Sequence, residues 1–81
     1  MKPYGNGGSG VARYEDGPDF IKVQFRHGRG DIYVYDYEVP GIADVERMKA
    51  LAAAGSGLST YIRQHVGNRY RRKEPPTLRL I

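Results

Sequence analysis

Basic residues precede residues 27–31 and tyrosines follow them, each set on one side of a predicted strand. This pattern is suited to binding nucleic acid. The set comprises three tyrosines and two cations from neighbouring predicted strands, namely Tyr33, Tyr35, Tyr37, Lys22 and Arg26. A sheet face that exposes tyrosine rings beside positive charge can stack unpaired bases and contact phosphates. If Ile32 and Val34 face the core with the apolar residues of the preceding strand, the pattern predicts such a surface.

The same alternation also allows the opposite arrangement, in which the tyrosines are buried. A shift of one residue in register, or helix packing on the other sheet face, exchanges the two faces. Aromatic rings bury a large area and often form part of a core. The sequence therefore leaves both a core role and an exposed role open for the three tyrosines.

A second basic segment lies near the C-terminus. It comprises five consecutive residues and one arginine from a preceding predicted helix, namely Arg69, Tyr70, Arg71, Arg72, Lys73 and Arg63. Guanidinium groups form forked hydrogen bonds with phosphate and stack on bases, so these residues are candidates for contacts with a nucleic-acid backbone. An acidic protein surface would attract the same charges, and a solvated basic tail is the third interpretation.

The other polar residues give weak signals for catalysis or metal binding. Residues 55–59, Gly-Ser-Gly-Leu-Ser, can hold an anion at a helix start, but a plain turn capped by Ser56 explains them better. His65 falls in an apolar stripe, which favours a packed, hydrogen-bonded side chain, and His27 falls in a turn. We therefore predict no cofactor, no metal site and no catalytic role.

Length and composition indicate one small domain. The 81 residues include no cysteine, so the fold depends on packing of the apolar residues, which make up 40% of the chain. The absence of cysteine is compatible with a cytoplasmic location, and no apolar run is long enough for a membrane span. The glycine-rich start predicts a flexible tail over residues 1–10.

Charge is distributed unevenly along the chain. Residues 1–46 carry five Lys/Arg and eight Asp/Glu, a balance of −3, whereas residues 47–81 carry eight Lys/Arg and one Asp/Glu, a balance of +7. This asymmetry either indicates a polyanionic partner for the C-terminal half or serves as solvated surface charge.

Alternation of apolar and polar residues predicts an antiparallel meander of two or three strands. Residues 11–15, 20–26 and 32–37 form the candidate strands, separated by turn signals at 16–19 and 27–31. Pro40 and Gly41 end the last of them, because proline cannot donate to a strand ladder.

Two helices are predicted after the meander. Ile42, Val45, Met48 and Ala52 share one helical face, and Gly55 is a suitable stop. The second helix begins near residues 56–57 and places five residues on one apolar stripe, namely Leu58, Tyr61, Ile62, His65 and Val66. Residues 69–73 are expected to be extended, and residues 74–81 to form a loose tail or an edge strand.

In this order of elements the chain resembles the KTSC family, named for the C-terminal domain of some lysyl-tRNA synthetases. The resemblance covers residues 11–73 and rests on short motifs: Phe25 followed by Gly28, Tyr33-Val34-Tyr35, Val39-Pro40, Ala54, Ser56-Gly57, Tyr61-Ile62-Arg63-Gln64-His65-Val66 and Tyr70-Arg71-Arg72. The chain departs from the family in having extra residues at 28–31, one more before Val39-Pro40, and Arg63 where the family usually has Asn. The family's function is not established; RNA binding has been suggested for it, so the resemblance implies RNA as a partner.

The sequence thus predicts an α+β domain with a two- to three-stranded antiparallel meander packed against two helices and a short basic C-terminal extended segment. Our leading hypothesis is a non-catalytic module that binds RNA through the tyrosines and basic residues named above. The alternative is an adaptor or small phage-type inhibitor that binds an acidic or sheet-edge protein partner. The oligomeric state stays open.

Overall fold

A five-stranded antiparallel sheet, with strands in chain order, forms one layer of the protein. The computed structural model describes residues 1–5, 10–26 and 30–76. The strands are β1 (Lys2–Pro3), β2 (Val11–Asp16), β3 (Phe20–Phe25), β4 (Ile32–Asp36) and β5 (Arg72–Glu74). The predicted α+β class is confirmed, but a meander of two or three strands is too small. β1 was not predicted, because it is short and lacks an alternating apolar pattern, and β5 was predicted only as part of an extended segment and a possible edge strand.

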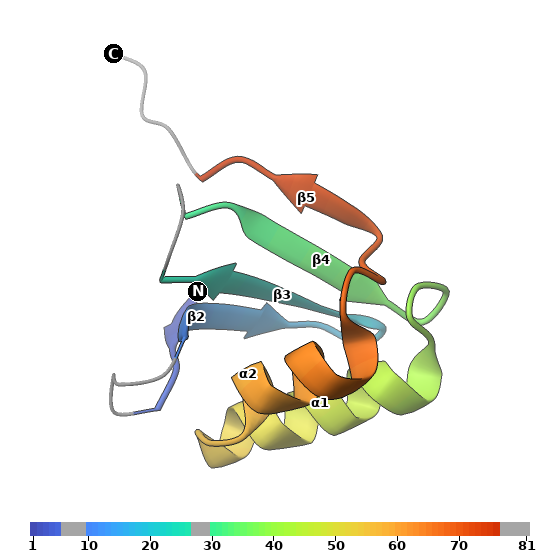
Figure 1. The fold of residues 1–81 in the computed structure, drawn as a ribbon, viewed down its shortest axis with the longest axis horizontal. Coiled ribbons are helices and arrows are strands. Elements are labelled where there is room, and N and C mark those ends of the chain that lie inside the picture. Colours follow the sequence, from blue (N-terminus) through green and yellow to red (C-terminus); the bar gives the residue numbers. More distant parts are fainter. Residues whose placement is uncertain (6–9, 27–29, 77–81) are drawn as a thin grey trace.

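The helical layer covers one face of the sheet (Figure 1). It comprises α1 (Ile42–Ala54), α2 (Leu58–Tyr61) and η1 (Ile62–Val66), a π-helical segment that continues α2. Gly55 ends α1 with φ 77°, a left-handed conformation that glycine adopts without strain. Val45, Met48 and Ala52 face the sheet as predicted, whereas Ile42 is 58% exposed. Ile42 is the first helical residue.

The register between β3 and β4 decides which side chains enter the core. Ile21 lies opposite Tyr35, and Val23 lies opposite Tyr33. Opposite residues in an antiparallel pair project from the same face, so the tyrosines share the helix-covered face with Ile21 and Val23. The arrangement in which Ile32 and Val34 face the core with Ile21 and Val23 is therefore wrong.

The N-terminal residues contribute to the core. Lys2 and Pro3 pair with β2, and Tyr4 is only 2% exposed. The prediction of a flexible tail is therefore wrong for residues 1–5, while residues 6–9 lie outside the described part of the chain. The many glycines of this segment predicted a flexible chain and gave no sign that Tyr4 is buried. Its ring packs edge-on against Tyr14, at 6.3 Å between centroids.

The start of the second helix is capped by Tyr4. Gly57 occupies the cap position, and no side-chain cap bond from Ser56 is present. The Leu58 N–H donates instead to the buried Tyr4 hydroxyl at 3.0 Å. The prediction that Ser56 caps this helix is therefore wrong, and a residue more than fifty positions upstream satisfies the helix end.

Candidate nucleic-acid interface

The sheet tyrosines form part of the packed interior. Tyr35 is 1% exposed, and Tyr33 and Tyr37 are half-buried against the core. Tyr33 makes edge-on contacts with Phe25 at 5.3 Å and with Tyr70 at 4.9 Å. Burial raises the pKa of Tyr35, with smaller contributions from Tyr33 and Tyr70. A ring enclosed on both faces cannot stack a base, so the exposed role for Tyr35 is wrong.

Tyr37 joins the sheet to α1. Its hydroxyl donates to Glu46 at 2.5 Å, and this hydrogen bond is the main cause that raises the pKa of Tyr37. Lys49 contacts the same carboxylate at 2.9 Å and also donates to the carbonyl of Gly17 at 2.8 Å. This network holds α1 against the turn between β2 and β3. Tyr37 therefore has a structural role, through its hydrogen bond to Glu46.

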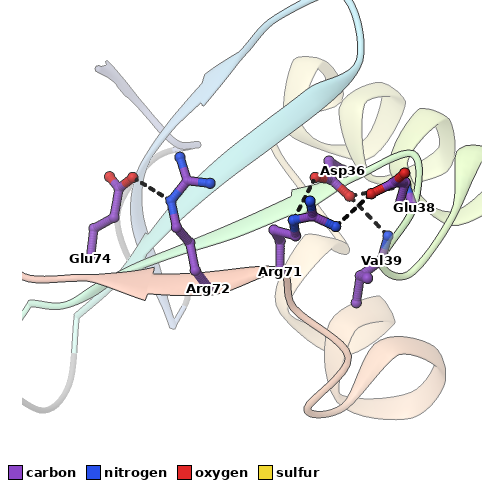
Figure 2. A network of polar contacts seen from close by, with 6 residues as sticks. All are labelled: Asp36, Glu38, Val39, Arg71, Arg72 and Glu74. Atoms are coloured by element: carbon purple, nitrogen blue, oxygen red, sulfur yellow. Dashed lines mark hydrogen bonds and ion pairs between the residues drawn. The ribbon is translucent and has the colours of Figure 1, made fainter.

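Arg71 is engaged by two carboxylates at the end of β4 (Figure 2). Its Nη1 donates to Glu38 at 2.6 Å, and its Nε lies 3.6 Å from the Asp36 carboxylate. The other Asp36 oxygen accepts the N–H groups of Glu38 and Val39, both at 2.9 Å. Arg71 therefore fastens the chain before β5 to the loop that follows β4.

The remaining cations of the basic segment also have acidic neighbours. Arg72 donates to Glu74 at 3.0 Å, and this bond is the main cause that lowers the pKa of Glu74 (Figure 2). Lys22 lies 3.6 Å from the same carboxylate. Lys73 lies 3.9 Å from Asp31 and 5.7 Å from the centre of the Tyr33 ring.

These ion pairs explain much of the charge asymmetry along the chain. Lys22, Arg69, Arg71 and Lys73 all pair across the boundary at residue 46, with carboxylates of the other half. The basic C-terminal half thus folds against the acidic N-terminal half. The imbalance in the sequence is offset within the molecule and is not by itself a sign of a polyanionic partner.

The two faces of the sheet differ in charge as well as in covering. On the face without helices, Lys22, Val34 and Arg72 lie opposite one another on three strands. A hollow of about 270 Å³ opens there, lined by Asp19, Phe20, Lys22, Val34, Asp36 and Arg72. Two cations and two carboxylates border it, so this hollow has no excess of positive charge.

Other arginines have no acidic partner among the described residues. Arg13, Arg26, Arg47 and Arg63 are exposed, and none makes a side-chain hydrogen bond or ion pair with the described residues. Arg63 lines a second hollow of about 360 Å³, which Gly10 and four hydroxyl-bearing side chains also border. Arg26 reaches the same region through its backbone, whose N–H donates to the Gly10 carbonyl at 2.9 Å.

A ring pair on the helical layer was missed by sequence reasoning. The rings of Tyr61 and His65 lie 4.7 Å apart and are tilted by 31°. His65 is exposed, so its predicted packed role is wrong, although its four-residue spacing from Tyr61 does place the two rings side by side. Arg69 contacts Asp44 at 3.2 Å, and Tyr61 donates to the same carboxylate at 2.6 Å.

Neither a metal site nor a membrane span emerges from the described ranges. Within residues 1–5, 10–26 and 30–76, no three His, Asp or Glu side chains gather where they could hold a metal ion. No helix in this part of the chain has the length and apolar character needed to cross a bilayer.

The chain matches no family model, no curated protein and no solved structure. The resemblance to the KTSC family therefore stays a prediction that rests on the short motifs quoted above.

Proposed function

We propose that this chain is a non-catalytic module that binds RNA through phosphate contacts from arginines on its helical layer. The observation that carries the proposal is that Arg47 and Arg63, from the adjacent elements α1 and η1, are exposed and have no acidic partner in the described residues. A free guanidinium offers five N–H donors in a fixed fork, which matches the oxygens of a phosphate.

The proposal moves the interface away from the sheet. Tyr35 is enclosed, and Arg71, Arg72 and Lys73 lie beside carboxylates that would repel a phosphate. Exposed ion pairs contribute little energy, so a polyanion can still displace them, but each gives less attraction than a free arginine. Residues 71–73 therefore act as secondary contacts.

We also propose that the chain is a divergent KTSC-like domain and that it acts in the cytoplasm. Residues 61–66 and 70–72 support the first statement, since they carry most of the resemblance. The absence of cysteine is compatible with the second.

Salt-dependent binding of labelled RNA tests the proposed function. Fluorescence anisotropy of a single-stranded oligonucleotide and of tRNA would be measured at about 50 and 200 mM salt. We expect Arg63→Gln to weaken binding and to lower the slope of log K against log salt by about 0.7, the loss of one single-strand phosphate contact.

Arg72→Gln is the matched control, because it removes the same charge from a residue already paired with Glu74. It should weaken binding clearly less than Arg63→Gln. Equal losses from both variants would show non-specific attraction, and absence of binding to either RNA at the lower salt would exclude the function.

A protein partner is the second candidate, favoured by the charge-balanced hollow on the face without helices and by β5, the last strand of the sheet. An edge strand can pair with an extended peptide, and the partly exposed Phe20 supplies apolar area in the hollow on this face. Nuclease-treated pull-downs would test this. A partner retained by Arg63→Gln and lost with Phe20→Ser would favour this candidate over RNA.

A further inference from the structure

One member of the ring pair on the helical layer is exposed to solvent. Tyr61 is half-buried and lies against His65 at 4.7 Å between ring centres, whereas His65 is exposed. No other ring in the described ranges contacts His65. The imidazole is thus exposed to solvent and has one protein ring beside it in the described part of the chain.

Asp44 holds this pair and a neighbouring guanidinium in place. One of its oxygens accepts the Tyr61 hydroxyl at 2.6 Å, and the other lies 3.2 Å from Nη2 of Arg69. The same Nη2 also donates to the main-chain carbonyl of His65. A single carboxylate therefore ties the ring pair to Arg69, and the side chain of Asp44 is itself only 22% exposed.

Positive charge remains available around the rings. Both contacts of Arg69 use Nη2, so its Nη1 and Nε have no partner within the described residues. Arg47 follows Asp44 by three residues on α1, so it lies on the same side of the helix as the carboxylate that Tyr61 contacts. The hydrogen bond to Asp44 raises the pKa of Tyr61, and the charges of Arg47 and Arg69 oppose this rise. Both oxygens of Asp44 have a partner, whereas Arg47 and Arg69 each keep N–H donors that have no partner in the described residues.

We propose that the exposed ring of His65 stacks an unpaired base of single-stranded RNA, with Arg47 holding the phosphate beside that base and Arg69, which is paired with Asp44, as a secondary contact. This inference rests on the proposed function and specifies both its site and its ligand. Every base has a π-face, so stacking tolerates different sequences, whereas paired bases in a duplex are already stacked on both sides. Proteins that bind single strands combine an aromatic ring that stacks a base with positive charges that contact the backbone. Here His65 supplies the ring, and Arg47 and Arg69 supply the charges.

The test uses a single-stranded oligonucleotide with 2-aminopurine at successive positions, since the fluorescence of this base reports stacking. Binding to the full chain should change the fluorescence at one or two positions. His65→Ala should abolish this change and lower affinity by about fivefold to a hundredfold, as expected for one stacked base. His65→Phe keeps a ring and should preserve both signals.

His65 is exposed, so both variants should fold, which circular dichroism checks. Salt-dependent anisotropy that is unchanged in His65→Ala, with 2-aminopurine signals also unchanged, would overturn the inference while leaving RNA binding intact. Equal affinity for a duplex and a single strand would overturn it as well. Absence of anisotropy change with any RNA would overturn both the inference and the proposed function, as would capture of an acidic protein that RNA does not displace.

Discussion

Tyrosines occupy two regions of this protein and have different roles in each. In the sheet, Tyr35 of β4 is 1% exposed, and Tyr70 lies edge-on to its ring at 6.4 Å between centroids. On the helical layer, Tyr61 is half-buried, lies beside the exposed His65 and shares Asp44 with Arg69. The first region stabilises the fold through buried area, whereas the second offers a ring and free donors to solvent.

The arginines divide between the same two regions. Arg71, at the sheet edge, faces Glu38 and Asp36 and closes a loop. Arg63, on η1, is exposed and has no acidic partner in the described part of the chain. A residue type that could bind RNA therefore has to be judged by its neighbours, because enclosure or ion pairing removes the property that binding needs.

The largest expected change in stability comes from removing a buried ring from the sheet region. Tyr35→Ala should lower the free energy of unfolding by about 3–5 kcal/mol, because it removes a buried ring and leaves a cavity. His65→Ala, in the helical region, should change it by less than about 0.5 kcal/mol. Urea denaturation followed by circular dichroism measures both. A small loss for Tyr35→Ala would mean that the ring is not enclosed, and the contrast between the regions would fail.

Alkaline pH should also act on the sheet region. Burial raises the pKa of Tyr35 above the ordinary value of about 10. The unfolded chain therefore releases this proton first, so stability is fully present below pH 10 and declines as pH rises further, by at most about 1.4 kcal/mol per pH unit for one proton.

Tyr35→Phe removes the ionisable group and isolates this contribution. Its urea midpoint should fall less steeply above about pH 10 than that of the unaltered protein. Parallel pH profiles for the two proteins would contradict the buried setting of the Tyr35 hydroxyl.

Much of the fold could be predicted from periodicity. The three central strands, the helix that ends at Gly55 and the second helical segment ending near Val66 all lie where the patterns indicated. Each depends on local signals, namely alternation in strands, a period near 3.6 in helices and glycine at a helix end.

The face of the sheet that enters the core could not be predicted in the same way. Alternation groups Tyr33 with Tyr35 and Ile32 with Val34, but it does not say which group meets the helices. Both groups are apolar enough to be buried, and Val34 is 3% exposed even on the face without helices. The register of β4 with β3, which depends on long-range contacts, decides which group faces the helices.

Two other features depended on contacts between distant residues. Tyr4 follows a lysine and a proline in a glycine-rich stretch, so nothing local predicted that it would cap a helix more than fifty positions away. The ion pairs of Arg69 and Arg71 likewise join segments that only the folded chain brings together.

A single change of tyrosine to phenylalanine should sharpen the comparison between buried and accessible hydroxyls. Tyr4→Phe leaves the buried N–H of Leu58 without an acceptor and should cost about 1–2 kcal/mol of unfolding free energy. Tyr61→Phe removes a hydrogen bond to Asp44 that is only partly buried, so about 0.5 kcal/mol is expected. Urea midpoints of the two variants measure the difference, and a reversed order would contradict the assigned burial of the two groups.

The smallest effect separates paired from free arginines. Arg71→Gln should cost about 0.5 kcal/mol, because its ion pairs with Asp36 and Glu38 are exposed to solvent and screened. Raising the salt concentration should shrink this loss, since screening already weakens the pairs in the unaltered protein. Arg63→Gln removes the same charge from a site without a partner in the described residues, and its urea midpoint should not move at either salt concentration. If Arg63→Gln destabilises the fold as much as Arg71→Gln, the guanidinium of Arg63 is held by the protein, and it is not free for phosphate.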